Sequence, residues 1–270
     1  MNIIINWKNL QKRIINWHEV EKVIRNGVQI RPESTPPTPT SWAICFTANT
    51  NGCSMRVMST MSTHANLRFS TDWVNWAGFR WRRSGSSWLS STIVLDNAWD
   101  KVYFRNADSI TTLSNASGTH QFLMTWSISA SGDVTYLLNP NGTTTIGYYA
   151  FYQLFKNCTS LTTSPELPAT TLWEGCYEEM FSDCSSLISI PKLPATNIPN
   201  SAYRNMFLRC SNVKISETQT WDYQTQYRIP TSWTWSAWSN SLDYMFSWTW
   251  WTFTWTPTVN TTYYTSNTVI

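Results

Sequence analysis

Apolar residues in the second half of the chain recur in a pattern that repeats every 26 residues. Three segments start at Phe151, Tyr177 and Tyr203, and each places an aromatic residue, a cysteine and an aliphatic residue at the same offsets. Units of this length that stack and bury their apolar faces against one another are typical of solenoid repeat proteins. The spacing predicts a short solenoid over residues 148–215, with a core formed by Phe155, Cys158, Leu161, Phe181, Cys184, Leu187, Phe207, Cys210 and Val213.

Each unit predicts one short helix followed by one short strand. In the second unit Tyr177, Met180, Phe181 and Cys184 are spaced i, i+3, i+4 and i+7, which places them on one face of a helix. The segment SSLISIP after Cys184 is β-prone and ends at Pro191, whose missing N–H would interrupt a ladder. Equivalent strands of successive units would then lie parallel, about 4.8 Å apart.

The rest of the chain reads mainly as β-structure. Residues 1–33 predict a small β-meander, and residues 34–41 form a Pro/Thr-rich linker. Residues 42–147 contain several short strand patterns separated by turn signals, which favour a β-sandwich-like module. Residues 216–270 are Ser/Thr-rich and would cap the repeats. The expected fold class is therefore mixed β and α/β, with the meander, the sandwich-like module and the short solenoid of residues 148–215 in that order.

The repeat pattern MFxxCxSLxxxPxLPAT resembles the BspA-type leucine-rich-repeat surface proteins of bacteria, including phage-like and metagenomic members. The resemblance covers about residues 148–215, and a weaker one extends over the β-prone segments upstream. It implies a surface-exposed protein that binds or adheres without catalysis. Two departures are the short array and an N-terminus, MNIIINWKNLQKRII, that lacks the apolar core of a signal peptide.

Tryptophan and glycine are present in unusual proportions, with 18 Trp and only 9 Gly. The N-terminal turns show how the two counts are connected. Asn26-Gly27 is a strong hairpin signal, and Asn6-Trp7 and Asn16-Trp17 occupy equivalent places ten residues apart. Glycine adopts the positive φ that such turns need, whereas tryptophan does so only with strain.

One hypothesis is that many tryptophans are UGA codons that the source organism reads as glycine. The suspects are Trp7, Trp17, Trp73, Trp81, Trp88, Trp99, Trp126, Trp221, Trp233, Trp235, Trp238, Trp248, Trp250, Trp251 and Trp255. Trp76 lies in a strand pattern and reads as a genuine tryptophan, while Trp42 and Trp173 fit either interpretation. The competing hypothesis is a Trp-rich face that binds glycans or lipid interfaces by stacking.

Charge and hydropathy exclude several classes of partner. Charged residues make up 13% of the chain and the net charge is +3, so no polyanion partner is indicated. The basic run Arg80, Arg82 and Arg83 is better explained as a solvated hairpin loop than as a nucleic-acid contact. No run approaches the roughly 18 apolar residues of a membrane span.

Residues with potential for chemistry are few. The cysteines in register favour buried core thiols, although their stacking would also make a disulfide conceivable, and Cys45 and Cys53 leave a hairpin bridge open. The chain has no CxxC pair and only three scattered histidines, so neither a metal site nor a cofactor is expected. GxSxG, HExxH and phosphate-binding loops are also absent from the sequence, which argues against an enzyme.

The leading hypothesis is a non-catalytic binding or adhesion protein that recognises a protein or glycan on a cell surface. Its contacts would come from exposed positions beside the predicted strands: Thr162, Ser164, Glu166, Ile188, Ser189 and Lys192. The expected location is extracellular, on the cell surface or on a virion. The alternative is a structural virion or appendage component such as a tail fibre. The sequence does not indicate an oligomeric state.

Overall fold

A computed structural model describes residues 23–25, 28–30, 43–61, 65–79, 81–84, 87–90, 92–234, 236–249 and 256–270. For strands β1, β2, β7 and β8 it describes the backbone alone. The chain divides into two compact units, Met1–Thr40 and Ser41–Ile270. In the first, β1 (Val23–Arg25) and β2 (Val28–Ile30) pair antiparallel across residues 26–27, where the sequence predicts a turn. The predicted turns at 6–7 and 16–17 and the linker 34–41 lie outside the described residues.

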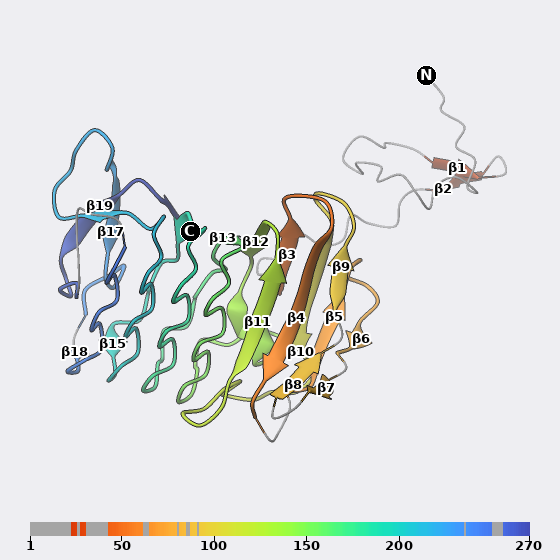
Figure 1. Cartoon of the computed structure of the whole chain (residues 1–270), viewed down its shortest axis with the longest axis horizontal. Helices are drawn as coiled ribbons and strands as arrows, with labels where there is room; N and C mark the ends of the chain where they lie inside the picture. The colour runs from red at the N-terminus through yellow and green to blue at the C-terminus, as the bar shows by residue number, and fades with distance from the viewer. Residues whose placement is uncertain are drawn as a thin grey trace. The chain divides into compact units, whose positions relative to one another are not determined.

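The second unit begins with two β-sheets (Figure 1). The six-stranded sheet has the order β13-β12-β3-β10-β5-β6, with bounds Leu161–Thr163, Ile128–Ser131, Ile44–Ala48, Lys101–Asn106, Leu67–Ser70 and Ala77–Gly78. The other has the order β11-β4-β8-β7, with β9 also on β4, and bounds His120–Thr125, Cys53–Ser59, Ser87–Ser90, Trp81–Ser84 and Ile93–Leu95. Neighbouring strands pair antiparallel except β12 and β13, which are parallel.

The two sheets contact each other through aromatic side chains. Residues along β4 and β10 alternate between more and less buried positions, as expected for strands with one face against a core. Phe46 on β3 lies with its ring centroid 5.0 Å from that of Phe122 on β11, and Phe104 on β10 is 5.4 Å from Phe122. The two sheets confirm the β-rich part of the predicted fold class.

The helices predicted in the repeats are absent. The single helix of the described residues is η3 (Val134–Leu137), a 3₁₀ turn whose N-cap Asp133 accepts the N–H of Thr135 at 2.7 Å. Residues 148–157, 174–183, 200–209 and 239–248 instead form four coils of consecutive tight turns, here called the turn stack. The coils lie side by side along the unit (Figure 1). The α/β part of the prediction, and the solenoid of helix–strand units, are therefore wrong.

The second coil shows how the turns replace a helix. The N–H of Met180 donates to the carbonyl of Tyr177, and the N–H of Cys184 to that of Phe181, each three residues back rather than four. Every fourth residue is left-handed, with φ of 63° at Gly175, 54° at Glu179 and 64° at Asp183. A row of four-residue turns brings residues i and i+4 and their neighbours to the same side, as a helix does. The apolar spacing in the sequence therefore fits both a helix and a row of turns.

Backbone hydrogen bonds join each coil to the next. The N–H groups of Tyr177, Glu179, Phe181 and Asp183 donate to carbonyls of the third coil at 2.7–3.0 Å. The third coil repeats this pattern onto the fourth, where Tyr203 donates to Ser241 and Phe207 to Met245, both at 2.9 Å. The segment LDYMF, expected to belong to a cap, is thus part of a fourth coil, which follows the third after a longer connection.

Stacked side chains form the core of the turn stack. Phe122, Phe155, Phe181, Phe207 and Phe246 form one column, with successive ring centroids 5.4–5.5 Å apart and interplanar angles of 14° or less. All nine residues of the predicted repeat core are buried. Because Phe122 belongs to the sheet pair, the column joins the sheets and the coils into one hydrophobic core.

The strands after the coils are shorter, and pair differently, than the sequence predicts. β13, β14 (Ser189–Ile190) and β16 (Ile215–Ser216) occupy the expected positions. However, β13 pairs with β12, β14 with β20 (Thr268–Val269), and β16 with β19 (Thr262–Thr265). The other pairs are β15 (Asn197–Ile198) with β18 (Ser236–Ala237) and β17 (Thr225–Arg228) with β19. The expected row of mutually paired parallel strands is therefore wrong; the turns carry the regular contacts between units.

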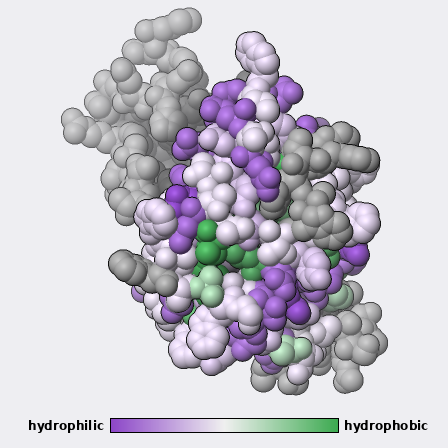
Figure 2. Space-filling model, turned by 90° about the vertical axis from the view of Figure 1, so that its left-hand side faces the viewer, coloured by the Kyte–Doolittle hydropathy of each residue, from purple (hydrophilic) through white to green (hydrophobic). Residues whose placement is uncertain are grey.

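Figure 2 views the unit from the end at which the turn stack lies. Residues of intermediate hydropathy cover much of this face, hydrophilic residues form scattered patches, and apolar residues gather near its centre. Within the described part of the chain, no helix is long and apolar enough to cross a membrane.

Candidate functional site

The six contact residues predicted from the sequence do not form one accessible surface. Ser164 and Ser189 are buried, and the Ser164 N–H donates to Ser189 Oγ at 2.7 Å. Thr162 is half-buried and donates its hydroxyl to the carbonyl of Ile128 at 3.1 Å. The remaining three residues, Glu166, Ile188 and Lys192, are exposed. Three of the six predicted contact residues therefore make hydrogen bonds between strands instead of contributing to an exposed surface.

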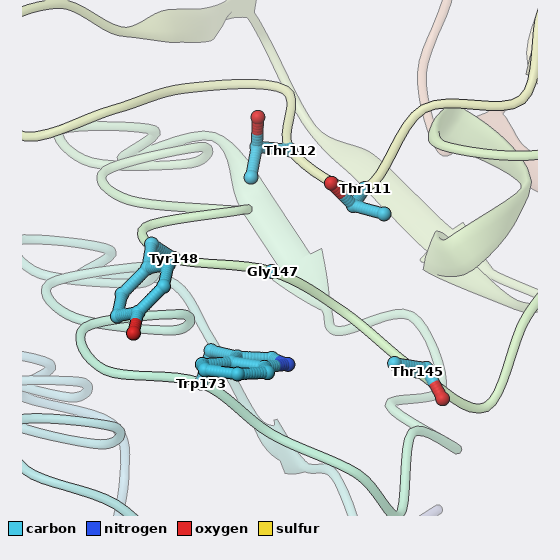
Figure 3. A pocket seen from close by; sticks show the side chains of 6 residues that line it. All are labelled: Thr111, Thr112, Thr145, Gly147, Tyr148 and Trp173. Atoms are coloured by element: carbon cyan, nitrogen blue, oxygen red, sulfur yellow. The ribbon is translucent and has the colours of Figure 1, made fainter.

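A small cleft lies instead where the sheets meet the turn stack (Figure 3). Its volume is about 270 Å³, and it is lined by Thr111, Thr112, Thr145, Gly147, Tyr148 and Trp173. Two of these side chains are large and accessible, since Tyr148 is 52% and Trp173 45% exposed. Their ring centroids are 4.9 Å apart and the ring planes meet at 49°. The cleft therefore presents an aromatic pair beside three threonines.

Three segments distant in sequence build the cleft. Thr111 and Thr112 come from the loop after β10, Tyr148 from the first coil, and Trp173 from the approach to the second. Figure 3 shows the threonines and the aromatic pair arranged around the backbone at Gly147. The Gly147 N–H donates to the Thr111 carbonyl at 2.8 Å, which ties the loop to the first coil.

Backbone hydrogen bonds also fix the two aromatic residues relative to each other. The N–H of Ile146 donates to the carbonyl of Thr171 at 3.1 Å, and the N–H of Tyr149 donates to that of Glu174 at 3.0 Å. These bonds lie on either side of the Tyr148–Trp173 pair. The pair is thus positioned by regular contacts between neighbouring coils rather than by a free loop.

Six charged residues of the turn stack form ion pairs between coils. Arg204 Nε donates to Glu178 Oε1 at 2.8 Å, and burial raises the pKa of Glu178 against the opposing effect of this guanidinium. Glu178 and its neighbour Glu179 are both engaged in ion pairs. The three pairs of the described residues are Lys156 with Glu179, Arg204 with Glu178, and Arg209 with Asp183. These groups stabilise the stacking of the coils.

The cysteines offer little nucleophilic chemistry. All six are buried free thiols, so the possible Cys45–Cys53 bridge is not formed. Cys184 donates its S–H to the carbonyl of Phe155 at 3.0 Å, and Cys210 to that of Phe181 at 2.9 Å. Burial raises the pKa of both thiols well above the ordinary range. They are protonated at neutral pH and act as core hydrogen-bond donors.

No group of three or more His, Cys, Asp or Glu side chains within the described ranges is arranged to hold a metal ion. Of the basic run, Arg80 lies outside these ranges and Arg82 and Arg83 belong to β7, whose side chains are not described. Comparison of the chain with protein-family models, curated proteins and solved structures found no match. The likeness to BspA-type repeats therefore rests on the residues alone.

Sequence reasoning missed this cleft. Tyr148 is not among the predicted contact residues. The sequence also leaves open whether residue 173 is a genuine tryptophan or a recoded glycine. A signal was nevertheless present, because Gly147 and Trp173 are 26 residues apart and so occupy the same place in successive repeats. That register puts Trp173 one coil away from Gly147-Tyr148.

Proposed function

We propose that the protein is a non-catalytic recognition protein that binds a glycan at the Tyr148–Trp173 cleft. The observation that carries the proposal is the accessible aromatic pair, held between two coils beside threonine hydroxyls. Large aromatic side chains left about half exposed next to a concave surface are typical of binding sites.

The chemistry of the lining favours a sugar. One face of a pyranose ring carries C–H groups that pack on the electron-rich face of an aromatic ring, while its hydroxyls exchange hydrogen bonds with groups such as threonine. None of the six lining residues is charged, so a neutral ligand fits best. Pockets for drug-sized ligands measure about 300–1,000 Å³. A cleft of about 270 Å³ suits one sugar ring at the end of a longer chain.

The BspA-type resemblance supports the setting. Surface proteins of that kind bind partners outside the cell, so we propose that this cleft acts on a cell surface or on a virion. The ion-paired coils would serve as a rigid support for the site, because each coil is fixed to its neighbours by backbone hydrogen bonds.

The test is binding to an array of immobilised oligosaccharides of hexoses and N-acetylhexosamines, followed by calorimetric titration with the oligosaccharide that binds best. We expect Tyr148→Ala and Trp173→Ala each to weaken the affinity about tenfold, or about 1.4 kcal/mol, since each removes one stacking surface.

Matched controls are Tyr244→Ala and Trp221→Ala. Tyr244 is 52% exposed, as is Tyr148, and Trp221 is 94% exposed, but neither lines the cleft. Both control variants should bind as the parent does. Absence of binding to every oligosaccharide, or an equal loss in the controls, would contradict the proposal.

A further inference from the structure

Left-handed backbone positions are unevenly distributed among residue types. Inside the turn stack such positions recur every fourth residue and are held by many kinds of residue, including Asn157, Asp183 and Arg209. The described residues outside the turn stack contain seven: Gly52, Gly132, Gly142, Asn260, Trp73, Trp99 and Trp126. Glycine and asparagine are the residues expected there, because a Cβ is strained at positive φ. Tryptophan is not expected, yet it holds three of the seven.

Trp99 has the local geometry of a glycine. The Asp100 N–H donates to the Asn97 carbonyl at 3.2 Å, which closes a four-residue turn with Trp99 as its third residue. Its φ is 73°, and a positive φ at this turn position is the reason that type II turns prefer glycine or asparagine. The indole is 73% exposed, so little packing offsets the strain.

Trp126 repeats the same combination. It lies in the two-residue connection between β11 and β12, with a φ of 62°, and its side chain is 70% exposed. Trp73 has a φ of 65° directly after Asp72, whose carboxylate accepts the N–H of Val74 at 2.9 Å. The Trp73 ring differs in packing against Tyr103, with centroids 4.9 Å apart. The turn at Trp73 nevertheless imposes the same backbone requirement.

Trp76 shows the opposite behaviour. It is not left-handed, its Nε1–H donates to the Trp73 carbonyl at 3.2 Å, and the Arg105 guanidinium lies 4.0 Å from its ring centroid. These contacts use the indole nitrogen and the ring face. The indole of Trp76 therefore makes specific contacts, whereas the indoles of Trp99 and Trp126 are mostly exposed to solvent.

We propose that codons 73, 99 and 126 are UGA and that the source organism inserts glycine there. UGA is a stop codon in the standard code and is reassigned in variant codes. Exchanging all fifteen suspects of the sequence would leave three tryptophans and raise glycine from 9 to 24 of the 270 residues, from about half its usual share of about 7% to somewhat above it. Trp248 is left-handed as well, but its place in the turn stack explains that without glycine.

The inference changes which aromatic residues can bind a ligand. Indoles at the exposed turns would be absent from the natural protein and could not form a Trp-rich binding face. Trp173 is not left-handed and contacts Tyr148, so it is expected to be encoded by UGG. UGA at codon 173 would contradict the proposed glycan cleft while leaving the inference about codons 73, 99 and 126 intact.

The decisive experiment reads the gene and the protein together. We expect UGA at codons 73, 99 and 126, UGG at codon 76, and peptides of the protein from its source that carry glycine at the three positions. UGG at codons 99 and 126, or peptide masses with tryptophan there, would overturn the inference.

A second measurement tests its physical basis in recombinant protein. The double variant Trp99→Gly/Trp126→Gly should melt several degrees above the parent, because glycine relieves the strain at both turns. Trp76→Gly should melt below the parent, because it loses packed contacts. A lower melting temperature for the double variant would contradict the inference.

Discussion

Gly147 sets how closely the first coil approaches the loop after β10. A Cβ built at this position would lie 2.7 Å from Thr112 Cγ2 and 3.1 Å from the Thr111 carbonyl oxygen. The first of these distances is shorter than real Cβ atoms show, and the second is to a backbone atom. The inner wall of the cleft therefore needs a residue without a side chain.

Gly147→Ala should destabilise the protein by about 1–3 kcal/mol, the usual effect of overpacking, and should weaken glycan binding by displacing the threonines. Thermal denaturation and calorimetric titration measure the two effects. Gly78→Ala is the control, because a Cβ there meets nothing within 4 Å, and its stability should stay within about 0.5 kcal/mol of the parent. Equal behaviour of the two variants would show that the close approach at Gly147 is unimportant.

The coils are the elements that sequence reasoning described only in part. The buried positions of the second coil, such as Tyr177 and Phe181, could be predicted because their spacing reports which side chains share a side. The backbone conformation could not, because that spacing fits a helix and a row of four-residue turns alike. The distinguishing feature is the left-handed residue in each turn, and residues such as Glu179 and Asp183 give no local sign of it.

A substitution with opposite expected effects in the two conformations tests the turn assignment. Ser201 has a φ of 55° and is equivalent to Gly175 in the preceding coil. Ser201→Gly should therefore stabilise the protein, by up to about 1 kcal/mol, because glycine removes the strain of positive φ. In a helix the same change would be destabilising, since glycine is the poorest helix former after proline.

The neighbouring Ala202 provides the control for that experiment. It is fully buried and is not left-handed, so Ala202→Gly should lower stability through lost packing and added chain entropy. Chemical denaturation of both variants gives the comparison. A destabilising Ser201→Gly would mean that the coils are helical rather than built from turns.

At the scale of the whole unit, one hydrophobic core extends from the sheets to the fourth coil. Its repeated part was visible in the sequence as columns of Phe, Cys and Leu. The junction with the sheets was not, because Phe46 and Phe122 have no repeat register that links them to Phe155. The cleft escaped prediction for the same reason, since the pairing of Gly147 with Thr111 joins segments that share no sequence pattern.

A continuous core implies that the sheets and the turn stack unfold together. Phe181 lies in the middle of the column, 5.5 Å from Phe155 on one side and 5.5 Å from Phe207 on the other. Phe181→Ala should cost about 3–5 kcal/mol and should lower hydrogen-exchange protection in β4 and β11 as much as in the coils, because the cavity weakens one cooperative unit. Ile188→Ala, at a site 52% exposed, should change stability by less than about 0.5 kcal/mol. Faster exchange confined to the coils, with β4 and β11 unchanged, would show instead that the sheets and the turn stack are energetically separate despite their shared aromatic column.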